Sequence, residues 1–189
     1  MNELVQSLLT SAGLGIGAGI NAYATLLVFG GLSRWRPGMF HGELADFFSS
    51  TPVLITVGVL YAMEFFADKI PTIDHVWDAV HTFIRPVAGA LVAFGAASHQ
   101  VPKGVLIVAT IIGGGAALTS HAAKATVRAA STVTTAGTAN PVISIVEDLF
   151  AFVNAAVAVF FPWLVLLFLV AVALVMFAIV KRVRKPQTF

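Results

Sequence analysis

Residues 13–23 read GLGIGAGINAY, with a glycine at every second position from Gly13 to Gly19. The surrounding residues are as apolar as a membrane span, yet glycine weakens the interior of a helix. A helix repeats about every 3.6 residues, so a two-residue repeat does not follow one helix face. Two interpretations stay open. The span is unwound near mid-membrane, where Asn21 serves a site, or the glycines form two overlapping GxxxG motifs that seat neighbouring helices.

The composition of the chain places it in the membrane. It has 189 residues, of which 58% are hydrophobic and 11% are charged, and its mean hydropathy is +0.92. Soluble domains carry about 25% charged residues. Because a crossing needs about 20 apolar residues, this length allows about six crossings and no sizeable soluble domain. We expect one all-α polytopic membrane domain over residues 1–189, with the lipid bilayer as its partner.

Six segments are apolar enough to cross. They are residues 4–32, 52–67, 74–98, 104–128, 141–160 and 162–180. Lipid leaves only helices or closed barrels as spanning structures, and the alternation of a barrel strand is missing. Between the first two segments, residues 33–50 mix aromatic and charged side chains, which predicts a loop with a short interfacial helix. Residues 131–140, STVTTAGTAN, are expected to form a polar linker.

The basic residues set the predicted orientation. Lys181, Arg182, Arg184 and Lys185 place the C-terminus in the cytoplasm, and six crossings then place the N-terminus there as well. The net charge of +2 comes mostly from this tail. A basic patch beside a span is typical of a topology signal, so we expect no nucleic-acid partner.

The two halves of the chain are similar to each other. Residues 51–67 align without gaps with residues 140–156, and Pro52, Val57 and Leu60 match Pro141, Val146 and Leu149. A glycine-rich span that turns polar precedes each block. This predicts two inverted three-helix repeats, over residues 1–100 and 101–189, with a broken or glycine-rich first helix in each, as many secondary transporters have. Chance matching among apolar residues is the alternative.

Ionisable and amide side chains inside the spans mark the candidate site, because such residues are costly in lipid and face the interior of a bundle. Helical spacing puts Glu64 and Asp68 on one face, and Asp78, His81 and Arg85 on another. The full set of predicted binding or coupling residues is Asn21, Glu64, Asp68, Asp78, His81, Arg85, His121, Lys124, Glu147 and Asn154.

These residue types support more than one chemistry. Carboxylates with an imidazole can ligate a divalent cation or relay a proton, and we consider Asp78, His81, Glu64 and Glu147 as metal ligands. The fixed charge of Arg85 opposes a simple metal cage unless a carboxylate pairs with it. The alternative is a set of structural ion pairs, in which Lys124 is the counter-charge of Glu147. The chain has no cysteine and no GxSxG, HExxH or Walker pattern, so we expect neither an enzyme nor a bound cofactor.

Three stretches carry a resemblance to a known family: GAGINAYATLLVFGGLSRW (17–35), DHVWDAVHTFIRPVAGAL (74–91) and NPVISIVEDLFAFVNAAVAV (140–159). Together they resemble a bacterial membrane family catalogued as domain-of-unknown-function family 4126, which implies the bacterial inner membrane and no established activity. MEFFADK (63–69) is also similar to the Glu-x-Gly-Asp-Lys motif of the calcium and manganese branch of the lysine exporter superfamily. It departs from that motif by one extra residue between Glu64 and Asp68 and by lacking the glycine.

The sequence as a whole predicts a small secondary transporter for a cation or a small polar solute. Its site would lie at the repeat interface, and so few helices suggest a homo-oligomer. One rival is a lipid-handling flippase or scramblase, which would use Arg85 and Lys124 on a headgroup phosphate and show a groove open to the bilayer. The other rival is a non-transporting scaffold, in which all the charges are paired.

Overall fold

The computed structural model describes residues 2–97 and 101–170, without the side chains of residues 71–75. Its elements are all helices: α1 (Glu3–Ile20), α2 (Ala22–Trp35), α3 (Glu43–Ser49), α4 (Thr51–Ala67), α5 (Pro71–Ala96), α6 (Lys103–Thr135) and α7 (Asn140–Phe160). A further helical stretch covers residues 162–170. The all-α prediction is therefore confirmed for the described residues. The rest of segment 162–180 and the basic tail at 181–185 lie outside them.

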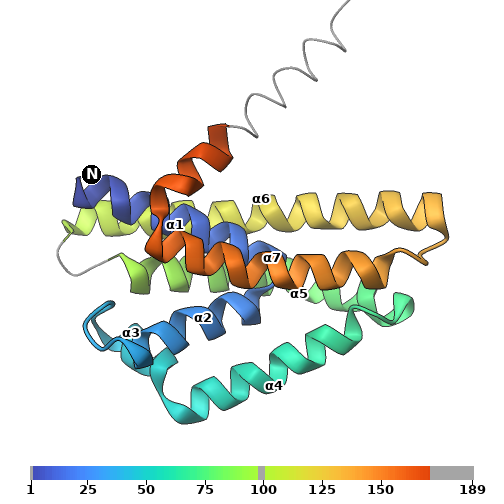
Figure 1. The fold of residues 1–189 in the computed structure, drawn as a ribbon, viewed down its shortest axis with the longest axis horizontal. Coiled ribbons are helices and arrows are strands. Elements are labelled where there is room, and N and C mark those ends of the chain that lie inside the picture. The colour runs from blue at the N-terminus through green and yellow to red at the C-terminus, as the bar shows by residue number, and fades with distance from the viewer. Residues whose placement is uncertain (1, 98–100, 171–189) are drawn as a thin grey trace, which may run out of the picture.

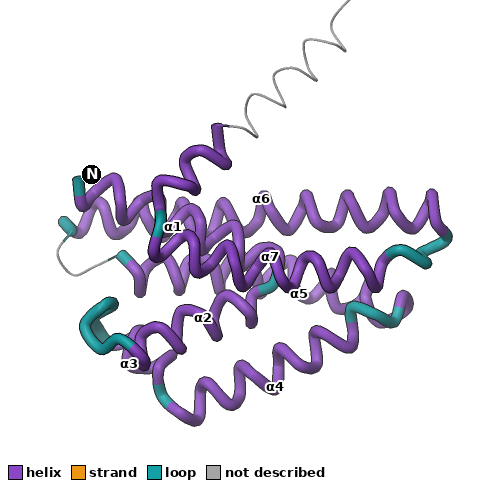
Figure 2. The backbone as a smooth tube through the Cα atoms, in the orientation of Figure 1, coloured by secondary structure: helices purple, strands orange, loops and turns teal. Residues whose placement is uncertain are grey.

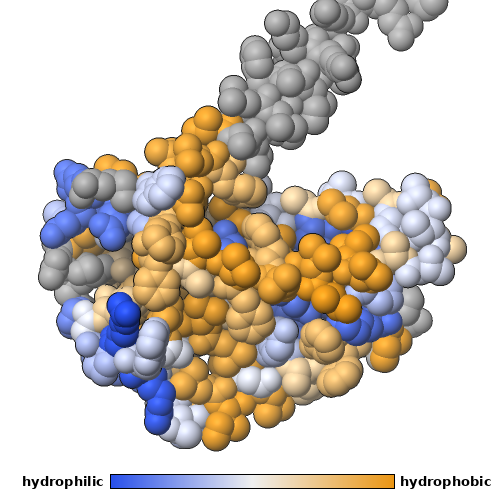
Figure 3. All heavy atoms as spheres, in the orientation of Figure 1, coloured by the Kyte–Doolittle hydropathy of each residue, from blue (hydrophilic) through white to orange (hydrophobic). Residues whose placement is uncertain are grey.

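Within the described residues, three helices are long and apolar enough to cross a membrane: α5 from Val76, α6 and α7. The bent pair α3 and α4, with an angle of 66° between them, makes a fourth if it counts as one span. Figure 3 shows apolar atoms over most of one face of the molecule. These helices indicate a membrane protein, and they are fewer than the six crossings expected.

The first predicted crossing, residues 4–32, is not one helix. α1 runs from the N-terminal end into the middle of the bundle, and α2 returns toward α3 (Figures 1 and 2). Contacts agree. Ser120 and Lys124 of α6 bond the carbonyls of Ile16 and Ile20, so α1 runs parallel to α6. Tyr23 packs on His81 and Phe29 lies against Gly95, so α2 runs parallel to α5. Arg85 bonds His121 and Gly89 packs on Gly113, so α5 is antiparallel to α6. The outer ends of α1 and α2 therefore lie at one end of the molecule. The expectation that both termini lie in the cytoplasm counted residues 4–32 as one crossing, so that expectation no longer follows.

Asn21 makes this break. Its backbone is extended, at φ −145° and ψ 108°. Its N–H still donates to the Gly17 carbonyl, which makes the last hydrogen bond of α1. Its side-chain oxygen accepts from Ala24 N at 2.9 Å and so caps α2. One residue thus ends one helix and begins the next, which is the usual work of asparagine at a helix start.

The glycines before the break allow close helix packing. A Cβ on Gly15 would stand 2.3 Å from the carbonyl oxygen of Gly113, and one on Gly19 would stand 2.1 Å from that of Ala117. Only glycine permits backbones to approach so closely. The glycines therefore seat α1 on α6, and they are helical rather than unwound. The helix breaks only after them, at Asn21.

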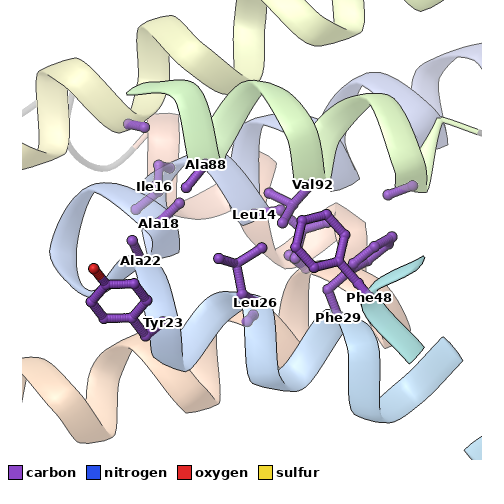
Figure 4. Close-up of a cluster of buried hydrophobic side chains, with 14 of the residues drawn as sticks. Leu14, Ile16, Ala18, Ala22, Tyr23, Leu26, Phe29, Phe48, Ala88 and Val92 are labelled. Carbon is purple, nitrogen blue, oxygen red and sulfur yellow. The ribbon is translucent and has the colours of Figure 1, made fainter. Parts of the chain in front are cut away.

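The apolar core lies between this hairpin and α5. Figure 4 shows Leu14, Leu26 and Phe29 facing Val92, with Phe48 of α3 beside them. These side chains are buried. The core holds the α1–α2 hairpin against α5 and so fixes the position of Asn21.

One other sequence prediction needs correction. α6 is continuous to Thr135, so the polar linker shrinks to residues 136–139. The first helix of the second half is glycine-rich, which is one of the two forms expected, and it is unbroken. The helix accommodates its threonines because Thr132 and Thr135 donate their hydroxyl protons to carbonyls four residues earlier. The short helix expected between the first two segments is present as α3.

Candidate functional site

Most of the predicted site residues meet in one half of the bundle. This half contains the α4–α5 and α6–α7 connections, drawn at the right of Figure 1. Glu64 and Asp68 come from the end of α4, Asp78, His81 and Arg85 from the start of α5, and His121 and Lys124 from α6. Glu147 comes from the start of α7. They form two clusters of charged side chains with the tip of the hairpin beside them.

The first cluster surrounds Arg85, and we call it the Arg85 network: Glu64, Asp78, His81, Arg85 and His121. Arg85 Nη2 donates to Glu64 Oε1 at 2.9 Å, and Nη1 lies 3.2 Å from Asp78 Oδ1. The side chains of Arg85 and Glu64 are completely buried. The charges of buried ions are normally paired, because desolvation costs several kcal/mol for each ion.

The two histidines of this network have different surroundings. His121 Nδ1 accepts a hydrogen bond from Arg85, and its Nε2 lies 3.0 Å from the Thr82 hydroxyl. His81 Nδ1 lies 2.8 Å from the Trp77 carbonyl, and the Trp77 ring stacks on its imidazole. His81 Nε2 lies 4.0 Å from Glu64 Oε1.

The second cluster surrounds Arg128, and we call it the Arg128 network: Asp68, Lys124, Arg128 and Glu147. Arg128 Nη2 donates to Asp68 Oδ2 at 3.0 Å and to Glu147 Oε2 at 2.7 Å. Lys124 Nζ lies 3.2 Å from Asp68 Oδ2 and 3.6 Å from Glu147 Oε2. Lys124 is thus a counter-charge of Glu147, as the sequence suggested, and Arg128 is a closer one.

Asp68 lies just beyond the last residue of α4. Burial raises the pKa of this carboxyl, but the charges of Lys124 and Arg128 outweigh burial, so its pKa lies below the ordinary value. Asp68 is therefore ionised at neutral pH, and the Arg128 network has two anions facing two cations.

The tip of the hairpin binds both signs of charge. Asn21 Nδ2 donates to Asp148 Oδ1 at 2.8 Å, which brings a carboxylate to the N-terminus of α2. Lys124 Nζ donates to the Ile20 carbonyl at 3.1 Å, which brings an ammonium to the C-terminus of α1. Each charge suits the helix dipole that it faces.

Some residues depart from the sequence prediction. Asn154 donates to the Gly13 carbonyl at 2.7 Å and ties α7 to α1, so it joins neither network. Arg128 and Asp148 are central to the site but were not among its predicted residues. A signal existed for Arg128, since Ala117, His121, Lys124 and Arg128 follow one buried stripe of α6. Asp148 had a signal of the same kind, since Asn140, Ser144, Asp148 and Ala151 follow one buried stripe of α7 that leaves out Glu147.

The four suggested metal ligands do not come together. Glu64, Asp78 and His81 belong to the Arg85 network, whereas Glu147 pairs with Arg128. Among the residues that the structure describes, no group of three or more histidines and carboxylates could hold a metal ion. The metal hypothesis therefore has no ligand set behind it in this part of the chain.

A groove of about 420 Å³ opens on the side of the bundle between α6 and α7. It is lined by Ile20, Ala123, Lys124, Val127, Val142, Ile143, Val146, Glu147 and Phe150. Its walls are apolar, and Lys124 and Glu147 are its charged residues. It joins the outer surface of α6 and α7 to the Arg128 network.

The chain belongs to the family described as a domain of unknown function, DUF4126, whose model matches residues 8–182. No match was found among curated proteins or among solved structures. The similarity to the lysine exporter superfamily therefore stays a prediction.

Proposed function

We propose that this protein is a small secondary transporter of the bacterial inner membrane, which carries a cation or a small polar solute past the tip of the α1–α2 hairpin. The observation that supports this proposal is the meeting of two buried charge networks at a helix break. Broken helices place backbone groups and helix dipoles inside a membrane without exposing them to lipid, and transporters use such breaks as binding sites.

The second support is incomplete hydrogen bonding in the two networks and at Asp148 beside the hairpin tip. Among the described residues, Glu64 Oε2, Asp68 Oδ1 and Asp148 Oδ2 are buried without a hydrogen-bond partner. A purely structural network would be expected to satisfy its buried acceptors, because each unsatisfied one costs about 1–3 kcal/mol. Three unused carboxylate oxygens instead suit a solute that donates hydrogen bonds.

The residues favour a polar solute over a bare divalent cation. Glu64, Asp68 and Glu147 each face an arginine or a lysine. A solute with its own ammonium or guanidinium group could replace these partners one at a time. A small metal ion would need several carboxylates freed together.

The inverted repeat is part of this proposal. α4 and α7 both begin with a proline in the first helical turn, at the aligned positions Pro52 and Pro141. The two helices run in opposite directions through the bundle (Figure 1), as inversion requires. The hairpin is an addition to the first unit that a plain three-helix repeat does not contain.

A lipid-handling protein is the second candidate, and the groove between α6 and α7 favours it. An acyl chain would lie along Val127, Ile143 and Val146, and the headgroup would meet Lys124 at the inner end of the groove. Lys124 already has Asp68 and Glu147 as partners, so an anionic headgroup would compete with two carboxylates. This competition ranks the lipid below the polar solute.

Transport can be tested with the purified protein. Thermal unfolding in detergent would be measured with lysine, arginine, calcium, manganese, magnesium and zinc, and flux of any stabilising compound would then be measured in proteoliposomes. A ligand at a hundred times its Kd stabilises the folded state by about 2.7 kcal/mol. We expect the stabilisation and the flux to disappear in Asp78→Asn and Glu147→Gln and to persist in Glu43→Gln, an exposed carboxylate on α3. Intact flux in both network variants would reject the proposal.

Lipid movement needs its own assay. Fluorescent phosphatidylglycerol in the proteoliposomes would be quenched from outside, and faster loss of the inner-leaflet signal than in empty vesicles would favour the lipid candidate. Val146→Trp, which fills the groove, should then stop this movement. Val133→Trp, at an exposed position on α6, is its matched control.

A further inference from the structure

The Arg85 network lacks one positive charge. Its two carboxylates, Glu64 and Asp78, share the single guanidinium of Arg85. The Arg128 network, by contrast, has two cations for two carboxylates. An unbalanced charge in a buried site is costly, and such a site commonly binds a proton instead. The proton needs an acceptor that the surrounding hydrogen bonds leave free.

His121 is not that acceptor. An arginine can only donate, so His121 Nδ1 must accept from Arg85 and carries no proton. Its Nε2 then carries the ring proton and donates to Thr82 Oγ1 at 3.0 Å, and Thr82 in turn donates to the Asp78 carbonyl. Both nitrogens are occupied in the neutral ring. A second proton on His121 would have to displace Arg85.

His81 leaves one nitrogen free. A carbonyl can only accept, so His81 Nδ1 carries a proton and donates it to Trp77 O. Its Nε2 has no hydrogen-bond partner among the residues described, and neither has Glu64 Oε2. His81 Nε2 and Glu64 Oε1 are 4.0 Å apart, with side chains 1% and 0% exposed. A bare imidazole nitrogen facing a carboxylate is repulsive, and a proton between them makes the contact attractive.

The groups around this pair do not supply the missing charge. Tyr23 of α2 packs edge-on against the His81 ring at 5.5 Å between centroids. Asp78 and Arg85 lie on the same helix as His81 and already pair with each other. From α6, His121 is neutral and Lys124 is engaged with Asp68 and Glu147. The free nitrogen of His81 is therefore the remaining place for a positive charge near Glu64.

We propose that His81 and Glu64 together bind one proton, and that this proton is the coupling ion of the transporter. The coupling role of the proton rests on the proposed function, whereas the binding of the proton does not. A solute that brings one positive charge to Glu64 and Asp78 replaces the charge of the proton. The proton is then released from His81 Nε2, and the network stays neutral. The substrate class is therefore a cationic solute exchanged for a proton.

Proton counting tests the binding without any substrate. The protein is unfolded in weakly buffered detergent near pH 7.5, and the protons released are measured with an indicator dye. The folded wild type should release about one proton more than Glu64→Gln, since the amide removes the unbalanced charge. His81→Phe should lose the same proton, whereas His121→Gln and Glu43→Gln should keep it. Equal release by the wild type and Glu64→Gln would overturn the proposal.

A second measurement avoids variants that fail to fold. Nitrogen-15 spectra of histidine-labelled wild type report the protonation of each ring nitrogen. We expect one histidine with both ring nitrogens protonated, or else an infrared band from a protonated carboxyl group. If no histidine carries protons on both ring nitrogens and no such band is present, the proposal is overturned.

Transport data separate this inference from the proposed function. If the proton is bound but no cationic solute crosses the vesicle membrane, the proton site stands and the transporter proposal fails. If a solute crosses without moving protons in the opposite direction, the transporter stands and the coupling fails.

Discussion

The two charge networks lie side by side, contain similar residues and are buried to a similar extent, yet they differ in balance. In the Arg128 network each carboxylate contacts both a lysine and an arginine. In the Arg85 network two carboxylates compete for one arginine, and histidines occupy the remaining positions. A balanced network stabilises one arrangement of the helices. An unbalanced one needs a mobile charge, so the proton proposed for exchange belongs to the Arg85 network.

The strongest test removes the central cation of the balanced network. Arg128→Gln leaves Asp68 and Glu147 with Lys124 alone, and breaking a buried pair in this way costs about 3–5 kcal/mol. We expect this loss in the free energy of unfolding, measured by denaturation in detergent. The double variant Arg128→Gln with Glu147→Gln restores the balance and should recover much of it. The exposed Arg36→Gln should change little, and an equal change there would remove the distinction between the networks.

A smaller effect is expected from the packing that holds both networks in place. Gly15→Ala puts a methyl group against the Gly113 carbonyl, and overpacking of this kind costs about 1–3 kcal/mol. Gly115 on α6 has nothing within 4 Å of its added Cβ, so Gly115→Ala should gain up to about 1 kcal/mol. Thermal unfolding of both variants measures the difference. Two equal shifts would mean that the close contact of α1 and α6 is wrong.

Loss of the cap at the helix break should lower the free energy of unfolding somewhat less than overpacking at Gly15 does. Asn21→Ala removes the bond to Ala24 N and the partner of Asp148, and loss of an N-cap costs about 0.5–2 kcal/mol. Asn21→Asp is the informative second variant, because it keeps the cap but sets a carboxylate against Asp148. If capping alone mattered, Asn21→Asp would behave like the wild type in thermal unfolding.

The smallest expected effect is the loss of the stability that ionised Asp68 contributes, and this loss occurs in acid. Although burial raises the pKa of Asp68, Lys124 and Arg128 hold it below the unfolded value of about 3.9. Its contribution to stability is therefore present above about pH 3.9 and is lost as the pH falls through the lower pKa of the folded state. Melting temperatures of wild type and Asp68→Asn should converge below about pH 4. Parallel curves would contradict an ionised Asp68.

The sequence predicted which residues gather in the candidate site better than it predicted how they are arranged. An ionisable side chain inside an apolar segment stands out whatever its partners are, so Glu64, Arg85 and Lys124 could be found from hydropathy alone. Their partners could not be assigned, because pairs such as Glu64 with Arg85 depend on how α4 packs against α5. The turn at Asn21 was suggested by the glycines, but its direction was not. A broken crossing and a hairpin have the same composition, and the packing of Tyr23 on His81 and of Phe29 against Gly95 of α5 decides between them.

The hairpin also has a consequence for biosynthesis. The carbonyl of Ile20 finds its partner on α6, 104 residues further along the chain, and the side chain of Asn21 finds its partner on α7, 127 residues further along. Polar backbone cannot rest alone in hydrocarbon, so the hairpin tip cannot settle until those helices have left the ribosome. We expect assembly to finish by docking the first segment made onto the last ones. Since the chain has no cysteine, a single Asn21→Cys variant can report this order. It should react with a water-soluble maleimide in chains truncated after α5, and become protected in the full-length protein.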